Sequence, residues 1–249
     1  MRIYRVKDYE KMSQKAASLL AAQIAAEPTS VLGLATGSTP EGTYGYLRKW
    51  YEEGTLDFSG IRTVNLDEYR GLERASAQSY YHFMREKLFR YINIEEAHTH
   101  IPNGEEADAK KVCREYEALI QSLGGVDLQL LGIGRNGHIG FNEPSDCFTK
   151  ACHCVTLTES TIEANRRFFD KTEDVPKQAY TMGIGTIMGA KKILLLASGQ
   201  EKAKALSEAL LGPVTPRMPA SILQFHPNVT VVADEEAMGM MDRASGSSM

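Results

Sequence analysis

Short apolar runs alternate along this sequence with longer segments whose apolar residues recur at helical spacing. The runs are rich in Val, Ile and Leu and typical of buried strands; they span 31–35, 61–66, 126–133, 153–157, 180–185, 193–197 and 229–232. Strands that alternate with helices of ten or more residues pair in parallel through crossover connections. We therefore expect an α/β fold with a mostly parallel twisted sheet flanked by helices on both faces, a modified Rossmann-like arrangement.

The helical segments between these runs have apolar residues three or four positions apart. They are expected at 8–26 (closed by Pro28), from Pro40 onward, from Tyr81 to Ile92, from Val112 to Leu123, at 159–170, at 200–211 and from Pro219. There is no repeat, long linker or shift in composition before the last residues. We expect one domain over residues 1–243, with the ASGSSM tail at 244–249 disordered.

Charge and hydropathy exclude two classes of partner. The net charge of −4 provides no basic surface of the kind that nucleic-acid binders carry. No apolar run approaches the roughly 18 residues needed to cross a bilayer. The first residues, MRIYRVKDYEKM, lack the apolar core of a signal peptide. We expect a cytoplasmic protein that binds neither nucleic acid nor membrane.

The cysteines do not predict a metal centre. Cys152 and Cys154 flank His153, and in a strand the two sulfur atoms would share one face while the imidazole points away. Structural zinc sites normally use ligand pairs with two to four intervening residues. The four cysteines are expected to be free thiols with packing roles.

Polar residues follow four of the predicted strands. In open parallel sheets ligands bind outside the carboxyl ends of the strands, where such loops converge. The candidate segments are TGST at 36–39, DEY at 67–69, GRNGH at 134–138 and SGQEK at 198–202. Each is a weak signal alone, and their expected convergence predicts one site.

Two of these segments are suited to an anion. Thr36, Gly37, Ser38 and Thr39 lie between a strand and a helix, where backbone amides and hydroxyls bind phosphate. The alternative is that Ser38 or Thr39 only caps the helix. No lysine follows as a P-loop requires. Lys202 is either a second phosphate donor or a solvated surface lysine, and Arg166 or Arg167 has the same two interpretations.

Acid–base groups occupy the other two segments. Asp67 and Glu68 end an apolar run, where a carboxylate can be a base with a raised pKa or simply a turn former. The stretch from Leu130 to Pro144 contains His138 and Glu143. A histidine oriented by a carboxylate can shuttle a proton near neutral pH.

The glycines of that stretch also match the dinucleotide fingerprint G-x-G-x-x-G. The fingerprint requires a helix that begins within the glycines, and Gly140 and Pro144 argue against one here. A nucleophile elbow, G-x-S-x-G, is absent. Proton transfer on a small phosphorylated molecule is the chemistry that these residues favour.

Five segments together resemble the glucosamine-6-phosphate deaminases. They are LGLATGSTPEGTY, TVNLDEYRGL, GIGRNGHIGFNEP, TIEANRRFF and SGQEKAKAL, in that order, and the resemblance covers residues 3 to 233. It implies conversion of D-glucosamine 6-phosphate and water to D-fructose 6-phosphate and ammonia, with no organic cofactor and no metal.

The resemblance also implies residue roles. Asp67 resembles the base that moves a proton from C2 to C1, and His138 the residue that moves a proton during opening of the pyranose ring. Glu143 and Asn136 resemble the partners that orient the imidazole. The phosphate-holding set corresponds to the 36–39 segment with Arg167 and Lys202.

Two departures from the family pattern lead to expectations. Many relatives have aspartate where this chain has Asn136, so the histidine lacks one negative partner. Allosteric hexameric relatives have a serine- and arginine-rich segment where this chain has PSDCFTKACHC, which offers only Lys150. We expect a monomer or a small homo-oligomer without allosteric activation by N-acetylglucosamine 6-phosphate.

Two alternatives remain at this point. A 6-phosphogluconolactonase or sugar-phosphate isomerase would have a similar architecture, although lactone hydrolysis has no obvious use for a base such as Asp67. A non-catalytic sugar-phosphate sensor would need a DNA-binding module, and neither terminus has the length or basic charge for one.

Overall fold

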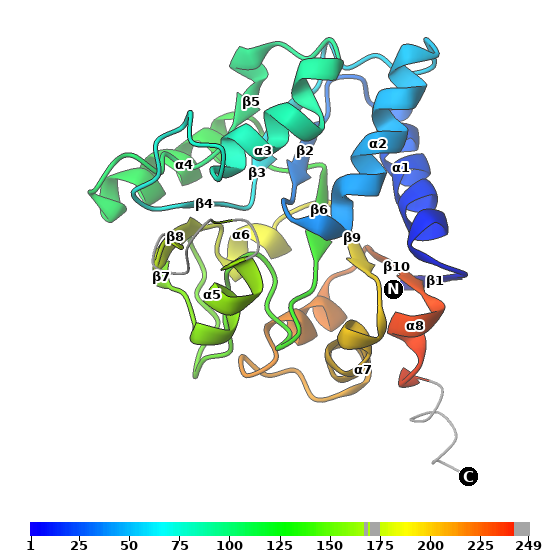
Figure 1. The fold of residues 1–249 in the computed structure, drawn as a ribbon, viewed down its shortest axis with the longest axis vertical. Coiled ribbons are helices and arrows are strands. Elements are labelled where there is room, and N and C mark those ends of the chain that lie inside the picture. The colour runs from blue at the N-terminus through cyan, green and yellow to red at the C-terminus, as the bar shows by residue number, and fades with distance from the viewer. Residues whose placement is uncertain (167–168, 170–174, 242–249) are drawn as a thin grey trace.

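Two sheets organise the chain in the computed structural model, which describes residues 1–166, 169 and 175–241 (Figure 1). The larger is a seven-stranded parallel sheet with the order β1-β10-β9-β6-β2-β3-β5. Its strands are β1 (Arg2–Val6), β2 (Val31–Leu34), β3 (Arg62–Asn65), β5 (Thr99–His100), β6 (Leu128–Gly132), β9 (Lys192–Ala197) and β10 (Val229–Asp234). The smaller is antiparallel, with the order β4 (Asp67–Tyr69), β8 (Gln178–Thr181) and β7 (His153–Thr156).

Helices connect the strands. The α-helices are α1 (Tyr9–Ala26), α2 (Ser38–Glu52), α3 (Tyr80–Lys87), α4 (Ala109–Ser122), α5 (Glu159–Asn165), α6 (Ile184–Met188), α7 (Ala203–Leu211) and α8 (Glu235–Met238). The 3-10 helices are η1 (Phe89–Tyr91), η2 (Glu96–His98), η5 (Gln200–Lys202) and η6 (Pro219–Phe225). Polar side chains at the N-cap positions explain where several helices begin. Asp8, Ser79, Asp108 and Thr158 each accept a hydrogen bond from a first-turn backbone amide.

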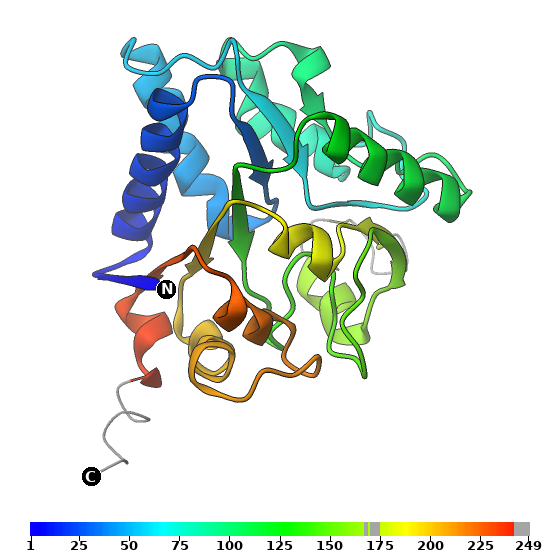
Figure 2. The same ribbon diagram turned by 180° about the vertical axis from the view of Figure 1, so that it is seen from behind.

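The parallel sheet is covered on both faces because its side chains alternate between two apolar clusters. On β2, Val31 packs into one cluster and Leu32 and Leu34 into the other. The first cluster includes residues of α4, α6, α7 and η6, and the second includes residues of α1, α2 and α3. Figure 1 shows α1 and α2 side by side, and Figure 2 shows the opposite face. The expected α/β fold with a mostly parallel sheet flanked on both faces is confirmed.

The antiparallel sheet was not anticipated from the sequence. The run at 180–185 was expected to be a strand of the parallel sheet, but β8 pairs antiparallel with β4 and β7, and α6 begins at Ile184. The run at 61–66 ends as a strand at Asn65, and Asp67 begins the next strand, β4. The apolar pattern identified these segments as extended, but it does not specify their pairing partners.

Other boundaries also differ from the expectations. The helix expected from Tyr81 to Ile92 ends at Lys87, and a 3-10 turn follows. Strands β1 and β5 were missed; β1 is largely exposed at the sheet edge and β5 has two residues, so neither contains a buried apolar run. Of the helix expected at 159–170, α5 accounts for Glu159–Asn165. Most of the remaining segment, and the 244–249 tail, lie outside the described residues. No helix in the described part of the chain has the length and apolar character to span a bilayer.

Candidate active site

The loops that follow β9, β6, β2 and β3 emerge at one edge of the parallel sheet, because these strands are neighbours and parallel. Thr39 approaches the end of β6, with its Cβ 4.0 Å from the position that a Cβ would take on Gly132. Arg135, in the loop after β6, forms an ion pair with Glu201 in the loop after β9. The TGST, GRNGH and SGQEK segments, three of the four predicted ones, therefore lie close together at this edge.

Asp67 lies where the chain leaves the parallel sheet for the antiparallel one. It is 7% exposed and pairs across the strands with Thr181 of β8. Its Oδ2 is 3.5 Å from the position that a Cβ would take on Gly140, in the loop that carries His138. Burial, with the negative charge of Glu68, raises the pKa of Asp67 to about 8. A carboxylate in this position is a strong base once it ionises.

Glu68 has a different environment from its neighbour. Its carboxylate accepts hydrogen bonds from the amides of Tyr69, Tyr80 and Tyr81, at 2.8 to 3.0 Å. Burial raises the pKa of Glu68 to about 7, and these three donors oppose that rise. Glu68 is thus the more readily ionised of the pair and anchors the first turn of α3, while Asp67 retains a proton to higher pH.

The loop after β6 is closely packed around its glycines. The amide of Gly134 donates to the His138 carbonyl at 2.9 Å, and the amide of Gly137 donates to the Gly134 carbonyl at 3.0 Å. A Cβ on Gly134 would lie within 2.5 Å of both ring nitrogens of His138, so only glycine admits the imidazole here. No helix follows among residues 134–152, which excludes the dinucleotide-binding interpretation as the sequence predicted.

Phe141 and Asn142, later in this loop, are hydrogen-bonded to β8 and to the residue after it. The amide of Phe141 donates to Thr181 Oγ1 at 3.0 Å. Asn142 Nδ2 donates to the carbonyls of Ile139 and Met182, at 3.0 and 2.9 Å. Because Thr181 also faces Asp67 across the strand pair, β8 sets the position of the His138 loop relative to Asp67.

His138, Glu143 and Asn136 form one cluster. Asn136 Nδ2 donates to Glu143 Oε2 at 2.6 Å, and Asn136 Oδ1 accepts from the His138 amide at 3.2 Å. His138 Nδ1 lies 3.5 Å from the same Glu143 oxygen and has no closer hydrogen-bond partner in the described structure. Asn136 therefore uses its side-chain N–H to hold the Glu143 carboxylate that faces the imidazole.

Glu143 is ionised despite its burial. Burial alone would raise its pKa, but the adjacent His138 ring and the donors Thr161 and Asn136 lower the pKa of Glu143 to about 2. The negative charge beside Nδ1 favours the tautomer with its hydrogen on Nδ1, which leaves the lone pair on Nε2.

The predicted phosphate segment forms a helix N-terminus. Gly37 occupies the N-cap position of α2 with φ 92° and ψ 177°, a conformation that favours glycine. Ser38 and Thr39 lie inside the first turn, so the alternative in which one of them is the N-cap is wrong. Lys202 ends η5 after β9, which β6 separates from β2 in the sheet, and its side chain is 17% exposed and 3.9 Å from Glu201. Arg167 lies outside the described residues.

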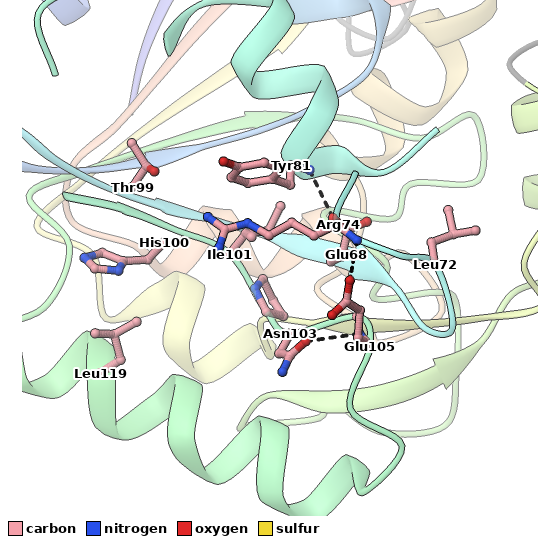
Figure 3. A pocket seen from close by; sticks show the side chains of 12 residues that line it. Glu68, Leu72, Arg74, Tyr81, Thr99, His100, Ile101, Asn103, Glu105 and Leu119 are labelled. Atoms are coloured by element: carbon pink, nitrogen blue, oxygen red, sulfur yellow. Dashed lines mark hydrogen bonds between the residues drawn. The ribbon is translucent and has the colours of Figure 1, made fainter. Parts of the chain in front are cut away.

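Elsewhere, the described residues form a cavity but no metal centre. In the described part of the chain no three His, Cys, Asp or Glu side chains are placed to hold a metal ion. A cavity of about 390 Å³ lies between α3, β5 and α4, lined by Glu68, Arg74 and Tyr81 among others (Figure 3). Of the candidate acid–base residues Glu68 lines this cavity, whereas Asp67, His138 and Glu143 do not.

Sequence reasoning missed three residues that hold the cluster together. Thr161 and Thr181 are buried threonines, a residue type with no motif of its own, and Gly134 belongs to the GRNGH segment and the false fingerprint but had no role of its own there. The signal that pointed to Thr161 was its place in the TIEANRRFF segment, although no role was attached to it.

The whole chain can be compared with known proteins. The sequence pattern of the family described as glucosamine-6-phosphate isomerases/6-phosphogluconolactonase matches residues 7–232. The chain belongs to this family. A glucosamine-6-phosphate deaminase of Lachnoclostridium phytofermentans is 56% identical over 232 residues, 93% of this chain and 98% of that protein. One from Clostridioides difficile is 54% identical over 242 residues, 97% of each chain.

Solved structures of the same family agree with the fold. A structure described as a monomeric glucosamine-6-phosphate deaminase is similar with a TM-score of 0.94 and 48% identity, over 96% of this chain and 100% of that one. A 6-phosphogluconolactonase of Trypanosoma brucei has a TM-score of 0.76 and 21% identity, over 96% and 98% of the two chains. The second likeness concerns the fold alone.

Proposed function

We propose that this chain is a glucosamine-6-phosphate deaminase, which converts D-glucosamine 6-phosphate and water to D-fructose 6-phosphate and ammonia. The observation that carries the proposal is the placement of two separate proton-transfer groups beside one loop at one sheet edge. Asp67 is a buried carboxyl with a raised pKa, and His138 is paired with an ionised Glu143. The deaminases that are more than half identical over nearly the whole chain support the same substrate.

Each group is assigned one half of the reaction. His138 accepts the proton of the C1 hydroxyl and returns a proton to the ring oxygen, which opens the pyranose. Asp67 then removes the proton from C2 and delivers it to C1, while the C1 carbonyl oxygen gains a proton and the amino nitrogen loses one, so that the amino aldose becomes a C2 imine with a hydroxyl at C1. Water then adds to the C2 imine and ammonia leaves, which gives fructose 6-phosphate. Asn136 and Glu143 orient the imidazole.

The phosphate is assigned to the start of α2 and to Lys202. Thr36, Gly37, Ser38 and Thr39 provide amides and hydroxyls at the positive end of the helix. Lys202 adds a cation from the loop after β9 at the same edge of the sheet, and Arg167 is assigned to the same set from the family resemblance.

The deciding experiment measures ammonia and fructose 6-phosphate released from glucosamine 6-phosphate by the purified protein. Equal amounts of both products support the proposal. Hydrolysis of 6-phosphogluconolactone without ammonia release from the amino sugar would replace it with the lactonase function.

We expect hyperbolic kinetics and a monomer. Lys150 is the sole basic residue of the segment 144–154, and its backbone carbonyl is bonded to the amides of Gly185 and Thr186 at the start of α6. The relative with a TM-score of 0.94 is described as monomeric. The test records rate against substrate concentration with and without N-acetylglucosamine 6-phosphate, and mass by light scattering. Sigmoidal rates that the acetylated sugar relieves would contradict this expectation.

Asn136→Asp should move the acid limb of the pH–rate profile to higher pH. The new carboxylate replaces an N–H donor that now lies 2.6 Å from Glu143 Oε2, so it must turn from Glu143, and the negative charge it adds near the ring favours the imidazolium form. The measurement is kcat/KM against pH. Asn103→Asp adds the same charge in an exposed loop and serves as the control. An unchanged acid limb would refute this role for position 136.

A further inference from the structure

The two oxygens of Glu143 have different partners. Oε2 faces the catalytic cluster, accepting from Asn136 at 2.6 Å and lying 3.5 Å from His138 Nδ1. Oε1 points to α5, where it accepts a hydrogen bond from the hydroxyl of Thr161, with the hydroxyl of Thr158 3.4 Å away. The orientation of the carboxylate toward the imidazole is thus held from the opposite side by a helix that carries none of the assigned acid–base groups.

Thr161 is itself held in place. Thr161 is 4% exposed, and its amide donates to the carbonyl of Thr158 at 3.0 Å and to the Thr158 hydroxyl oxygen at 3.3 Å. Thr158 is the N-cap of α5, so this bonding fixes the start of the helix. The branched β-carbon of threonine restricts rotation of the side chain, which leaves few directions open to the hydroxyl.

An apolar cluster fixes the position of α5 relative to Asp67 and to the His138 loop. Tyr69, Phe141, Leu157 and Ala179 form the buried cluster, and Ile162 of α5 packs on it. Tyr69 is two residues from Asp67, and Phe141 lies in the His138 loop. Their rings are 5.9 Å apart between centroids. Movement of α5 would therefore disturb the same packing that supports Asp67 and the loop.

We infer that Thr161 is a positioning residue for the ring-opening step, because its hydroxyl orients the Glu143 carboxylate toward His138. The inference rests on the proposed function. Without the hydroxyl, Oε1 loses its closest donor in a buried setting and the carboxylate is free to turn. The imidazolium form of His138 would then lose its oriented negative partner.

Thr161→Val and Thr161→Ser separate orientation from packing. Valine keeps the shape and removes the donor, and serine keeps the donor. We expect Thr161→Val to lower kcat about tenfold with KM within about twofold, and to move the acid limb of kcat/KM to lower pH, because the ring loses its oriented negative partner. Thr161→Ser should restore both values to near those of the unmodified protein. Thr161→Ala, which lacks the donor without adding a methyl group in its place, should behave as the valine variant does.

Thr186→Val is the matched control. The Thr186 hydroxyl donates to Glu117 Oε1 at 2.6 Å, a bond of the same kind between α6 and α4 that involves no residue of the proposed site. Its loss should leave kcat and the acid limb unchanged. If Thr161→Val and Thr161→Ala keep the kcat and the acid limb of the unmodified protein, or if Thr161→Ser fails to restore them, the inference is overturned.

A spectroscopic reading tests the contact independently of activity. The ¹⁵N resonances of the His138 ring should change in Thr161→Val and remain unchanged in Thr186→Val. A protein that releases no ammonia would refute the proposed function, while a ring signal that responds to Thr161 would still support the positioning contact. Ring resonances that are identical in all variants would overturn that contact.

Discussion

Asp67→Asn should reduce kcat for glucosamine 6-phosphate by about a thousandfold, because general bases contribute on the order of 10² to 10⁴ in rate. Asparagine has nearly the same shape but cannot accept the C2 proton. Burial keeps the Asp67 carboxyl protonated up to about pH 8, and the same burial makes its ionised form a strong base. Binding of a hexitol 6-phosphate, which has no carbonyl group to isomerise, should persist in the variant because the phosphate-binding segments are untouched.

The same substitution should stabilise the fold above neutral pH. The unfolded chain loses the Asp67 proton near pH 4, while the folded chain keeps it to about pH 8. The contribution of Asp67 to stability is therefore complete below pH 4 and is lost progressively as the pH rises to 8. Asparagine does not ionise, so the variant should have a free energy of unfolding higher by roughly 2–5 kcal/mol at pH 8 and about equal at pH 4. Urea unfolding at the two pH values measures the difference.

Asp127→Asn is the control for both effects. Asp127 precedes β6 at the opposite edge of the sheet, where it bonds to the Val31 amide and to Lys191, each at 2.7 Å. Burial would raise its pKa, but these partners lower it. The control should retain activity and lose stability at pH 8. Full activity of Asp67→Asn would remove Asp67 from the mechanism.

His138→Gln should reduce kcat by about a hundredfold and change how the rate depends on enzyme concentration. Glutamine keeps hydrogen-bonding capacity but cannot carry the proton from the C1 hydroxyl to the ring oxygen. The variant can then act only on sugar that has opened spontaneously in water. At high enzyme concentration its rate should level off at the rate of spontaneous opening, whereas the rate of Asp67→Asn should remain proportional to enzyme.

His153→Gln is the control for this variant. His153 lies on β7, where its ring nitrogen bonds to the Ala151 carbonyl at 3.1 Å, and it contacts none of the assigned catalytic residues. It should behave like the unmodified protein. A His138→Gln rate that stays proportional to enzyme at all concentrations would show that ring opening does not depend on this imidazole.

The sequence determined the layered fold because local patterns carry that information. Alternating residues such as Val31 and Leu32 divide between two faces whatever their partners are, and Asp8 and Thr158 mark helix starts through their own amide contacts. The order of strands along the chain also predicted that the TGST, DEY, GRNGH and SGQEK segments would reach one edge. Contacts between loops place the TGST, GRNGH and SGQEK segments at that edge.

Only the tertiary structure decided the hydrogen-bond partners and the pKa values of the acid–base groups. Asp67 and Glu68 are adjacent and chemically alike, yet three amides from β4 and α3 favour ionisation of Glu68 while Asp67 is buried without such donors. Glu143 acquires its low pKa first from His138 and then from Thr161 and Asn136, which lie 5, 18 and 7 positions away in the sequence. Such shifts depend on which atoms lie within a few ångströms, and pairing between distant segments determines that distance. Asn136 illustrates the difference, because its amide donates to Glu143, a contact that the sequence did not reveal.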